Sequence, residues 1–270
     1  MARVDLGDIA LNVVEDGDPD GAPLVFANSL GTDLRLWDQI LPLLPAGLRI
    51  IRYDMRGHGA SDCPPGPYSM GQLVRDAEQL LDHLGLRDCV FVGLSIGGMV
   101  AQGLAIKRLD LVRGVVLSNT AAKIGQAGMW DDRIRAARAG GIEALADATM
   151  ARWFTRAFRA SPAVRFWRDM MTNQPLEGFI GCMNAISGTD FYTPTSGLRL
   201  PALGIAGSDD GSTPPDLVRE TIELIPGADF HLIRRAGHLP CVEQPDEYAR
   251  ILSGFLHKIG HVHIDPGLDI

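Results

Sequence analysis

The stretch that most constrains the fold runs from Cys89 to Ile106, CVFVGLSIGGMVAQGLAI. Its first six residues are apolar enough to predict a short buried strand, and the apolar spacing that follows Ser95 predicts a helix packed on a sheet. Ser95 itself is flanked by Gly93 and Gly97. A serine between glycines, placed between a strand and a helix, is the pattern of a nucleophile elbow, G-x-S-x-G.

The elbow pattern has a specific physical meaning. The turn is so tight that Ser95 takes a strained backbone conformation, at a cost of about 1–3 kcal/mol. Gly93 and Gly97 carry no Cβ, so neighbouring backbone can approach closely. The hydroxyl then stands clear of the sheet edge. The pentapeptide alone occurs by chance in roughly one chain in ten of this length, so its position between strand and helix carries the inference.

Strand-like and helix-like segments alternate along most of the chain. Strands are predicted at 3–15 as a hairpin and at 23–27, 49–53, 89–94, 111–118, 200–206 and 229–233. Helices are predicted near 33–44, 69–84, 96–106, 215–225 and 246–259. This alternation indicates a mostly parallel sheet covered by helices on both faces.

Residues 120–197 differ from the rest, because they contain helical segments rich in Arg, Ala, Met and Trp and no continuous apolar strand. We therefore expect an α/β core formed by 1–119 and 198–260, a helical cap inserted at 120–197, and a loose C-terminal tail over 261–270.

Composition narrows the function classes. With 270 residues and 46% hydrophobic content the chain can bury a large core, and a net charge of −8 disfavours a nucleic-acid partner. No apolar run reaches the roughly 18 residues that span a membrane, and the charged N-terminus does not suit a signal peptide. The four cysteines lack metal-ligand or C-x-x-C spacing, and the tail sequence HVH lacks a third ligand. We expect a cytoplasmic protein with reduced thiols and no metal.

A serine nucleophile needs a base, and His238 is the best placed of the seven histidines. It follows Ala236-Gly237 in the loop between the last predicted strand and the last helix, at the sheet edge where Ser95 emerges. His58, in the segment RGHG, is expected to shape a loop.

The acid that orients the base should lie on an earlier loop at the same edge. In the segment GSDDGSTPP, Asp209 and Asp210 compete for this role, and the turn favours Asp210. Two N–H donors should stabilise the oxyanion, namely those of Ile96, after the serine, and Leu30, in the turn NSLG. An ordinary strand-to-helix turn is the alternative for NSLG.

Four segments together resemble the α/β-hydrolase fold family: GLSIGG, DMRGHGASD, GSDDGSTPP and AGHLPCVEQP. The resemblance spans nearly the whole chain and implies a mostly parallel eight-stranded sheet flanked by helices, with an inserted helical cap. Within the family, NSLGTDLRLWD, RYDMRGHGASDCPPGPYS, TAAKIG and DGSTPPDLVRETIELIPGA look closer to the 3-oxoadipate enol-lactonases, which act in aromatic breakdown. The resemblance implies a triad of Ser95, Asp210 and His238 and no cofactor.

The substrate implied by the resemblance carries a carboxylate, so the pocket should offer a cation. The predicted cap contains Arg133 beside Trp130 and Arg152 beside Trp153. A guanidinium can hold a carboxylate through two parallel hydrogen bonds, although most arginines on such helices are solvated. The tryptophans are as consistent with plain cap core as with pocket walls. We expect a small-molecule lactone or ester as partner. The alternatives are a broad carboxylesterase, a C–C bond hydrolase, or a non-catalytic binding protein of the same fold.

Overall fold

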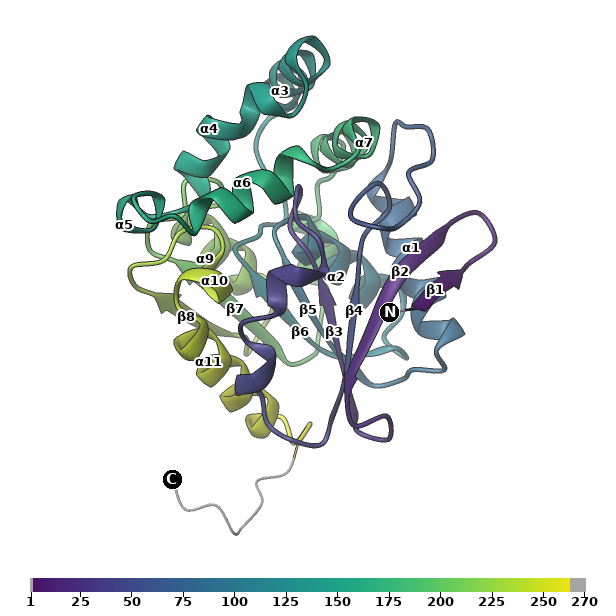
Figure 1. Ribbon diagram of the computed structural model, residues 1–270. Coiled ribbons are helices and arrows are strands. Elements are labelled where there is room, and N and C mark those ends of the chain that lie inside the picture. Colours follow the sequence, from purple (N-terminus) through teal and green to yellow (C-terminus); the bar gives the residue numbers. More distant parts are fainter. Residues whose placement is uncertain (1, 263–270) are drawn as a thin grey trace.

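The computed structural model describes residues 2–262, which form one twisted eight-stranded sheet covered by helices (Figure 1). The strands are β1 (Ala2–Asp5), β2 (Ala10–Gly17), β3 (Ala22–Ala27), β4 (Leu48–Tyr53), β5 (Cys89–Leu94), β6 (Val112–Ser118), β7 (Ala202–Gly207) and β8 (Asp229–Ile233). Their spatial order is β1-β2-β4-β3-β5-β6-β7-β8. Only the pairings β1 with β2 and β2 with β4 are antiparallel within the described chain. The predicted mostly parallel sheet is confirmed.

The helices follow the strands in chain order. They are α1 (Met70–His83), α2 (Ile96–Lys107), α3 (Ala127–Gly140), α4 (Glu143–Trp153), α5 (Arg156–Arg159), α6 (Val164–Thr172), α7 (Leu176–Ser187), α8 (Tyr192–Ser196), α9 (Pro215–Glu223), α10 (Pro240–Glu243) and α11 (Pro245–Lys258). Helix α1, in the segment where a helix is predicted near 69–84, begins at a capping box formed by Ser69 and Gln72.

The helix predicted over 33–44 is wrong. The segment instead forms two 3₁₀ turns, η1 (Leu34–Trp37) and η2 (Leu41–Leu43). Pro42 interrupts any longer helix at this point. The Leu34 N–H donates to Asp54 and the Leu34 carbonyl accepts from Arg52, so this backbone is bonded to the neighbouring strand region rather than to a following helical turn.

The centre of the sheet is fully buried. All six residues of β5 are buried, and α2 packs on β5 and β6 with ten of its residues buried. Because four parallel neighbours β3, β5, β6 and β7 end at the same edge, the loops that follow them share one side of the sheet.

Helices α3 to α8 lie between β6 and β7 in the chain, within the segment for which an insertion is predicted, and we call them the cap helices. Figure 1 shows α3, α4, α6 and α7 together at the top of the molecule. Helix α3 packs on α4 and α7, and α4 packs on α5 and α6, so these five helices form a layer of their own, whereas α8 packs on α2.

The predicted loose tail over 261–270 lies outside the described residues except for His261 and Val262. Those two are buried, and His261 Nε2 lies 3.0 Å from the Pro23 carbonyl oxygen. Within residues 2–262, no helix has both the length and the apolar composition needed to cross a membrane.

Candidate active site

Ser95 occupies a strained turn between β5 and α2. Its φ and ψ are 58° and −117°, a conformation that a non-glycine residue rarely adopts. The turn requires glycine on both sides of the serine, because the neighbouring backbone leaves no room for a Cβ. A Cβ on Gly93 would lie 2.1 Å from the Gly97 carbonyl oxygen, and one on Gly97 would lie 2.2 Å from the Ala27 carbonyl oxygen. The strand, the strained serine and the helix have the geometry of a nucleophile elbow.

Asp210 and His238 meet at the end of the neighbouring strands. Asp210 follows β7, His238 follows β8, and His238 Nδ1 lies 2.8 Å from Asp210 Oδ2. Both residues are buried. The other predicted candidate, Asp209, is exposed and accepts a hydrogen bond from the Ser208 hydroxyl at 2.6 Å.

Asp210 is held by a full set of donors. The Ser212 and Thr213 N–H groups donate to Oδ1 at 2.7 and 3.1 Å, and the Asn119 amide and the Thr213 hydroxyl each donate to Oδ2 at 2.8 Å. Burial acts to raise the pKa of Asp210. The charge and hydrogen bond of His238, with the other donors, outweigh it and hold this pKa below its usual value. An ionised Asp210 fixes the His238 ring with its proton on Nδ1, which leaves Nε2 as an acceptor.

Asn119 and Thr213 are site residues that sequence reasoning missed. Asn119 immediately follows β6 and has positive φ, 45°, and Thr213 lies in the same GSDDGSTPP segment as Asp210. The position of Asn119 at the carboxyl end of the strand next to the elbow strand could have pointed to it.

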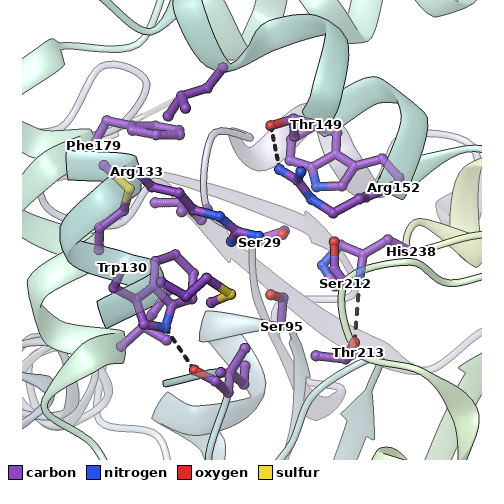
Figure 2. A pocket seen from close by; sticks show the side chains of 18 residues that line it. Ser29, Ser95, Trp130, Arg133, Thr149, Arg152, Phe179, Ser212, Thr213 and His238 are labelled. Atoms are coloured by element: carbon purple, nitrogen blue, oxygen red, sulfur yellow. Dashed lines mark hydrogen bonds between the residues drawn. The ribbon is translucent and has the colours of Figure 1, made fainter. Parts of the chain in front are cut away.

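Ser95, Thr213 and His238 line the same pocket (Figure 2). Leu30 also belongs to its lining. In residues 2–262 no direct hydrogen bond joins the Ser95 hydroxyl to the imidazole; catalytic hydrogen bonds often tighten only when substrate is bound. The N–H groups of Leu30 and Ile96 have no acceptor among residues 2–262, so both remain available to a ligand.

The turn that contains Leu30 is oriented by His58. The N–H of Gly31 donates to His58 Nε2 at 3.0 Å, so this ring nitrogen carries no proton. His58 is fully buried, and burial lowers its pKa to about 4. The structure thus gives His58 a loop-shaping position, next to the peptide that presents the Leu30 N–H.

The pocket comprises about 680 Å³ of space, which includes solvent at its opening. Its walls come from the loops after the strands and from the cap helices α3, α4 and α7. The lining residues are Ser29, Leu30, Ser95, Ile124, Gly125, Met129, Trp130, Arg133, Leu145, Thr149, Arg152, Trp153, Phe179, Met183, Ile186, Ser212, Thr213 and His238. No aspartate or glutamate belongs to this lining.

Two arginines reach into the pocket from different cap helices, Arg133 from α3 and Arg152 from α4 (Figure 2). Burial and the charge of Arg152 lower the pKa of Arg133 to about 10, and burial lowers that of Arg152. Arg133 lies over the Trp130 ring at 4.9 Å, and Arg152 donates to the Thr149 hydroxyl at 3.0 Å. Neither forms an ion pair with a carboxylate among the described residues. Two partly buried cations without an anion favour an anionic ligand.

The predicted pocket aromatics take different positions. The Trp130 ring N–H donates to the Ile124 carbonyl at 2.7 Å, and the Trp153 ring stacks on the His238 ring with centroids 6.4 Å apart. Both side chains are buried and both line the pocket.

A family model described as the alpha/beta hydrolase fold matches residues 22–245. The chain belongs to the α/β-hydrolase fold family. The predicted family and fold are thereby confirmed, including the eight-stranded sheet.

Relatives of this α/β hydrolase include both lactonases and esterases. 3-Oxoadipate enol-lactonase 2 from Acinetobacter baylyi is 35% identical over 93% of this chain and 94% of the relative. The enol-lactonase structure from Burkholderia xenovorans LB400 matches with a TM-score of 0.91 and 35% identity, over 94% of this chain and 99% of that one. A thermophilic esterase from Thermogutta terrifontis, solved with malate bound, matches with a TM-score of 0.87 and 29% identity over 94% and 95%.

Proposed function

We propose that this hydrolase opens the ring of a carboxylate-bearing enol-lactone, of the kind represented by 3-oxoadipate enol-lactone, in the breakdown of aromatic compounds. The observation that carries the proposal is the pair Arg133 and Arg152, two cations with no carboxylate partner, in the pocket that also holds Ser95 and His238. The 35% identity to enol-lactonases supports the same substrate class, and so does the malate, itself a dicarboxylate, in the related esterase.

The first half-reaction forms an acyl-enzyme. Ser95 Oγ attacks the lactone carbonyl carbon while its proton passes to His238 Nε2. The oxyanion lies between the N–H groups of Leu30 and Ile96. The ring C–O bond then breaks, and His238 returns the proton to the leaving oxygen. The enol formed in this way tautomerises to a ketone. Asp210 stabilises the imidazolium during this transfer.

The second half-reaction releases the product. A water molecule gives a proton to His238 and attacks the acyl carbon, and the same two N–H groups stabilise the second oxyanion. The bond to Ser95 Oγ breaks, and the serine recovers its proton from His238. One water is consumed, and a second carboxylate is formed. Each half-reaction uses base catalysis, which typically supplies 10²–10⁴-fold.

The test compares kcat/KM for the enol-lactone, followed by its ultraviolet absorbance, with kcat/KM for a neutral p-nitrophenyl ester. We expect a strong preference for the lactone, and loss of both activities in Ser95→Ala. Arg133→Ala should raise KM for the lactone about 10- to 100-fold, the value of one or two charge-assisted hydrogen bonds, and leave the neutral ester nearly unchanged.

The exposed Arg135 on the same helix provides the matched control. Arg135→Ala should leave both substrates unaffected. Equal effects of Arg133→Ala on lactone and ester would contradict the carboxylate-binding role of Arg133. Near-normal turnover by Ser95→Ala would contradict the proposed mechanism. Preference for the neutral ester would favour the alternative, a broad carboxylesterase with the same chemistry.

A further inference from the structure

The last turn of α4 is bonded directly to both loops that carry Asp210 and His238. The Arg152 carbonyl accepts the Gly211 N–H at 3.0 Å, and the Trp153 carbonyl accepts the His238 N–H at 2.7 Å. The Trp153 and His238 rings are inclined by only 24°. The imidazole therefore rests on a cap helix as well as on the sheet.

The approach of these segments is too close for side chains on the two loops. A Cβ on Gly237 would lie 2.2 Å from the Trp153 carbonyl oxygen, and one on Gly211 would lie 3.0 Å from Arg152 Cα. Glycine at both positions lets the backbone of α4 contact the backbone of the loops.

Glu243 joins the same two segments through its side chain. One carboxylate oxygen, Oε2, accepts the Gly237 N–H at 2.6 Å. The other, Oε1, accepts the Thr155 hydroxyl at 2.6 Å and the Thr155 N–H at 3.1 Å. Hydrogen bonds to a carboxylate are about twice as strong as those between neutral groups.

These contacts distinguish Glu243 from a glutamate that merely begins the last helix. Glu243 is the last residue of α10, and its carboxylate accepts hydrogen bonds from Gly237 and Thr155, with none from the N–H groups of α11 among the described residues. Glu243 is partly buried. Its carboxylate lies between Gly237, which precedes His238, and Thr155, which follows the end of α4 by two residues. Both of its oxygens are used there.

We propose that Glu243 is a positioning residue for His238. Its carboxylate accepts hydrogen bonds from both Gly237 and Thr155 and so fixes the position of the imidazole relative to Ser95. The inference rests on the proposed serine mechanism and extends it to a residue that does not touch substrate. A carboxylate is required because donors approach it from both sides. A neutral amide offers one acceptor oxygen and presents an NH₂ group to the other side.

The test is Glu243→Gln, which keeps size and removes one acceptor. Two readouts are followed: kcat and KM with p-nitrophenyl acetate, and the rate at which a fluorophosphonate labels Ser95. Labelling forms a bond between Oγ and phosphorus, breaks the P–F bond and passes the serine proton to His238, so it reports on the base without using the arginines. We expect both kcat and the labelling rate to fall at least about tenfold, with KM within about twofold, since small misplacements cost up to about 10²-fold.

The exposed Glu223, at the end of α9, is the matched control, and Glu223→Gln should match the parent protein. A normal kcat and normal labelling rate in Glu243→Gln would overturn the proposal, even if the melting temperature fell. If that variant does not fold, Thr155 decides: Thr155→Val should lower the labelling rate, and Thr155→Ser should retain most of it. Equal rates in these two variants would also overturn it.

The two proposals fail separately. A preference for neutral esters over the lactone would remove the proposed substrate and leave the Glu243 measurements unaffected, because fluorophosphonate labelling needs only Ser95 and its base.

Discussion

A single buried imidazole, His58, connects protonation to the shape of the Leu30 turn. Its Nε2 accepts the Gly31 N–H, an interaction that is lost when this nitrogen binds a proton. Burial is the largest influence on its pKa, lowering it to about 4, and the Arg56 carbonyl acts in the opposite direction. An unfolded chain would protonate His58 near pH 6.5.

This difference predicts an acid-dependent loss of stability. Because the pKa of His58 is lower in the folded than in the unfolded chain, its full contribution to stability is present above about pH 6.5. This contribution falls as the pH falls, and by about pH 4 roughly 3 kcal/mol of it has been lost. His58→Gln keeps a possible acceptor and cannot titrate. We expect its unfolding free energy, measured with urea, to vary less between pH 6.5 and 4 than that of the parent.

The exposed His231, in the edge strand β8, supplies a control. His231→Gln should leave the pH dependence of unfolding as it is in the parent. A His58→Gln variant with the parent's pH dependence would contradict the role of His58 as a buried neutral imidazole.

At the scale of elements, the elbow depends on how closely α2 approaches β3. A Cβ on Gly97 would meet the carbonyl oxygens of Ala27 at 2.2 Å and Asn28 at 2.8 Å, both of which are backbone atoms that cannot turn aside. Gly97→Ala must therefore displace either the helix that follows Ser95 or the strand that leads to Leu30.

We expect Gly97→Ala to lower kcat by more than about 10²-fold, the effect of losing or misplacing an oxyanion donor, and to lower the melting temperature. Gly254→Ala in α11 is the matched control, because a Cβ there meets nothing within 4 Å. It should leave kcat unchanged and stabilise the protein by about 0.5–1 kcal/mol, the helix preference for alanine. Normal turnover in Gly97→Ala would show that the turn tolerates displacement.

The same elements show what the sequence could predict. Asp210 and His238 could be proposed because each follows a strand of a parallel sheet, and such loops meet at one edge. The hydrogen bonds of Glu243 could not be predicted in this way. Its partner Thr155 lies 88 residues away in the chain, and the contact between the two depends on how the cap helices pack on the core. The 3₁₀ turns after β3 could not be predicted for a related reason. Arg52 and Asp54 form hydrogen bonds with the Leu34 backbone, and the hydrophobic periodicity of the sequence does not indicate such contacts.

At the scale of the whole molecule, the residues of the proposed chemistry come from two layers. Ser95, Asp210 and His238 follow strands of the sheet, and Arg133 and Arg152 belong to cap helices. A pocket that holds two cations without anions is unfavourable in the empty protein, because partly buried charge lacks its water and has no counter-ion. We therefore expect the two unpaired guanidinium groups to lower the stability of the ligand-free protein.

This trade-off predicts opposite effects on stability and on ligand response. Arg133→Met removes one charge while keeping an unbranched side chain of similar length, and we expect it to raise the melting temperature of the empty protein by a few degrees. The six-carbon dicarboxylate adipate should raise the melting temperature of the parent, since a ligand bound only to the folded state adds about 2.7 kcal/mol at a hundredfold excess over Kd. That increase should be much smaller in Arg133→Met. The ring of Trp130, which lies 4.9 Å from the guanidinium, compensates the charge only in part. A lower melting temperature in Arg133→Met, together with an undiminished response to adipate, would mean that the guanidinium serves the packing of α3 and not the recognition of an anion.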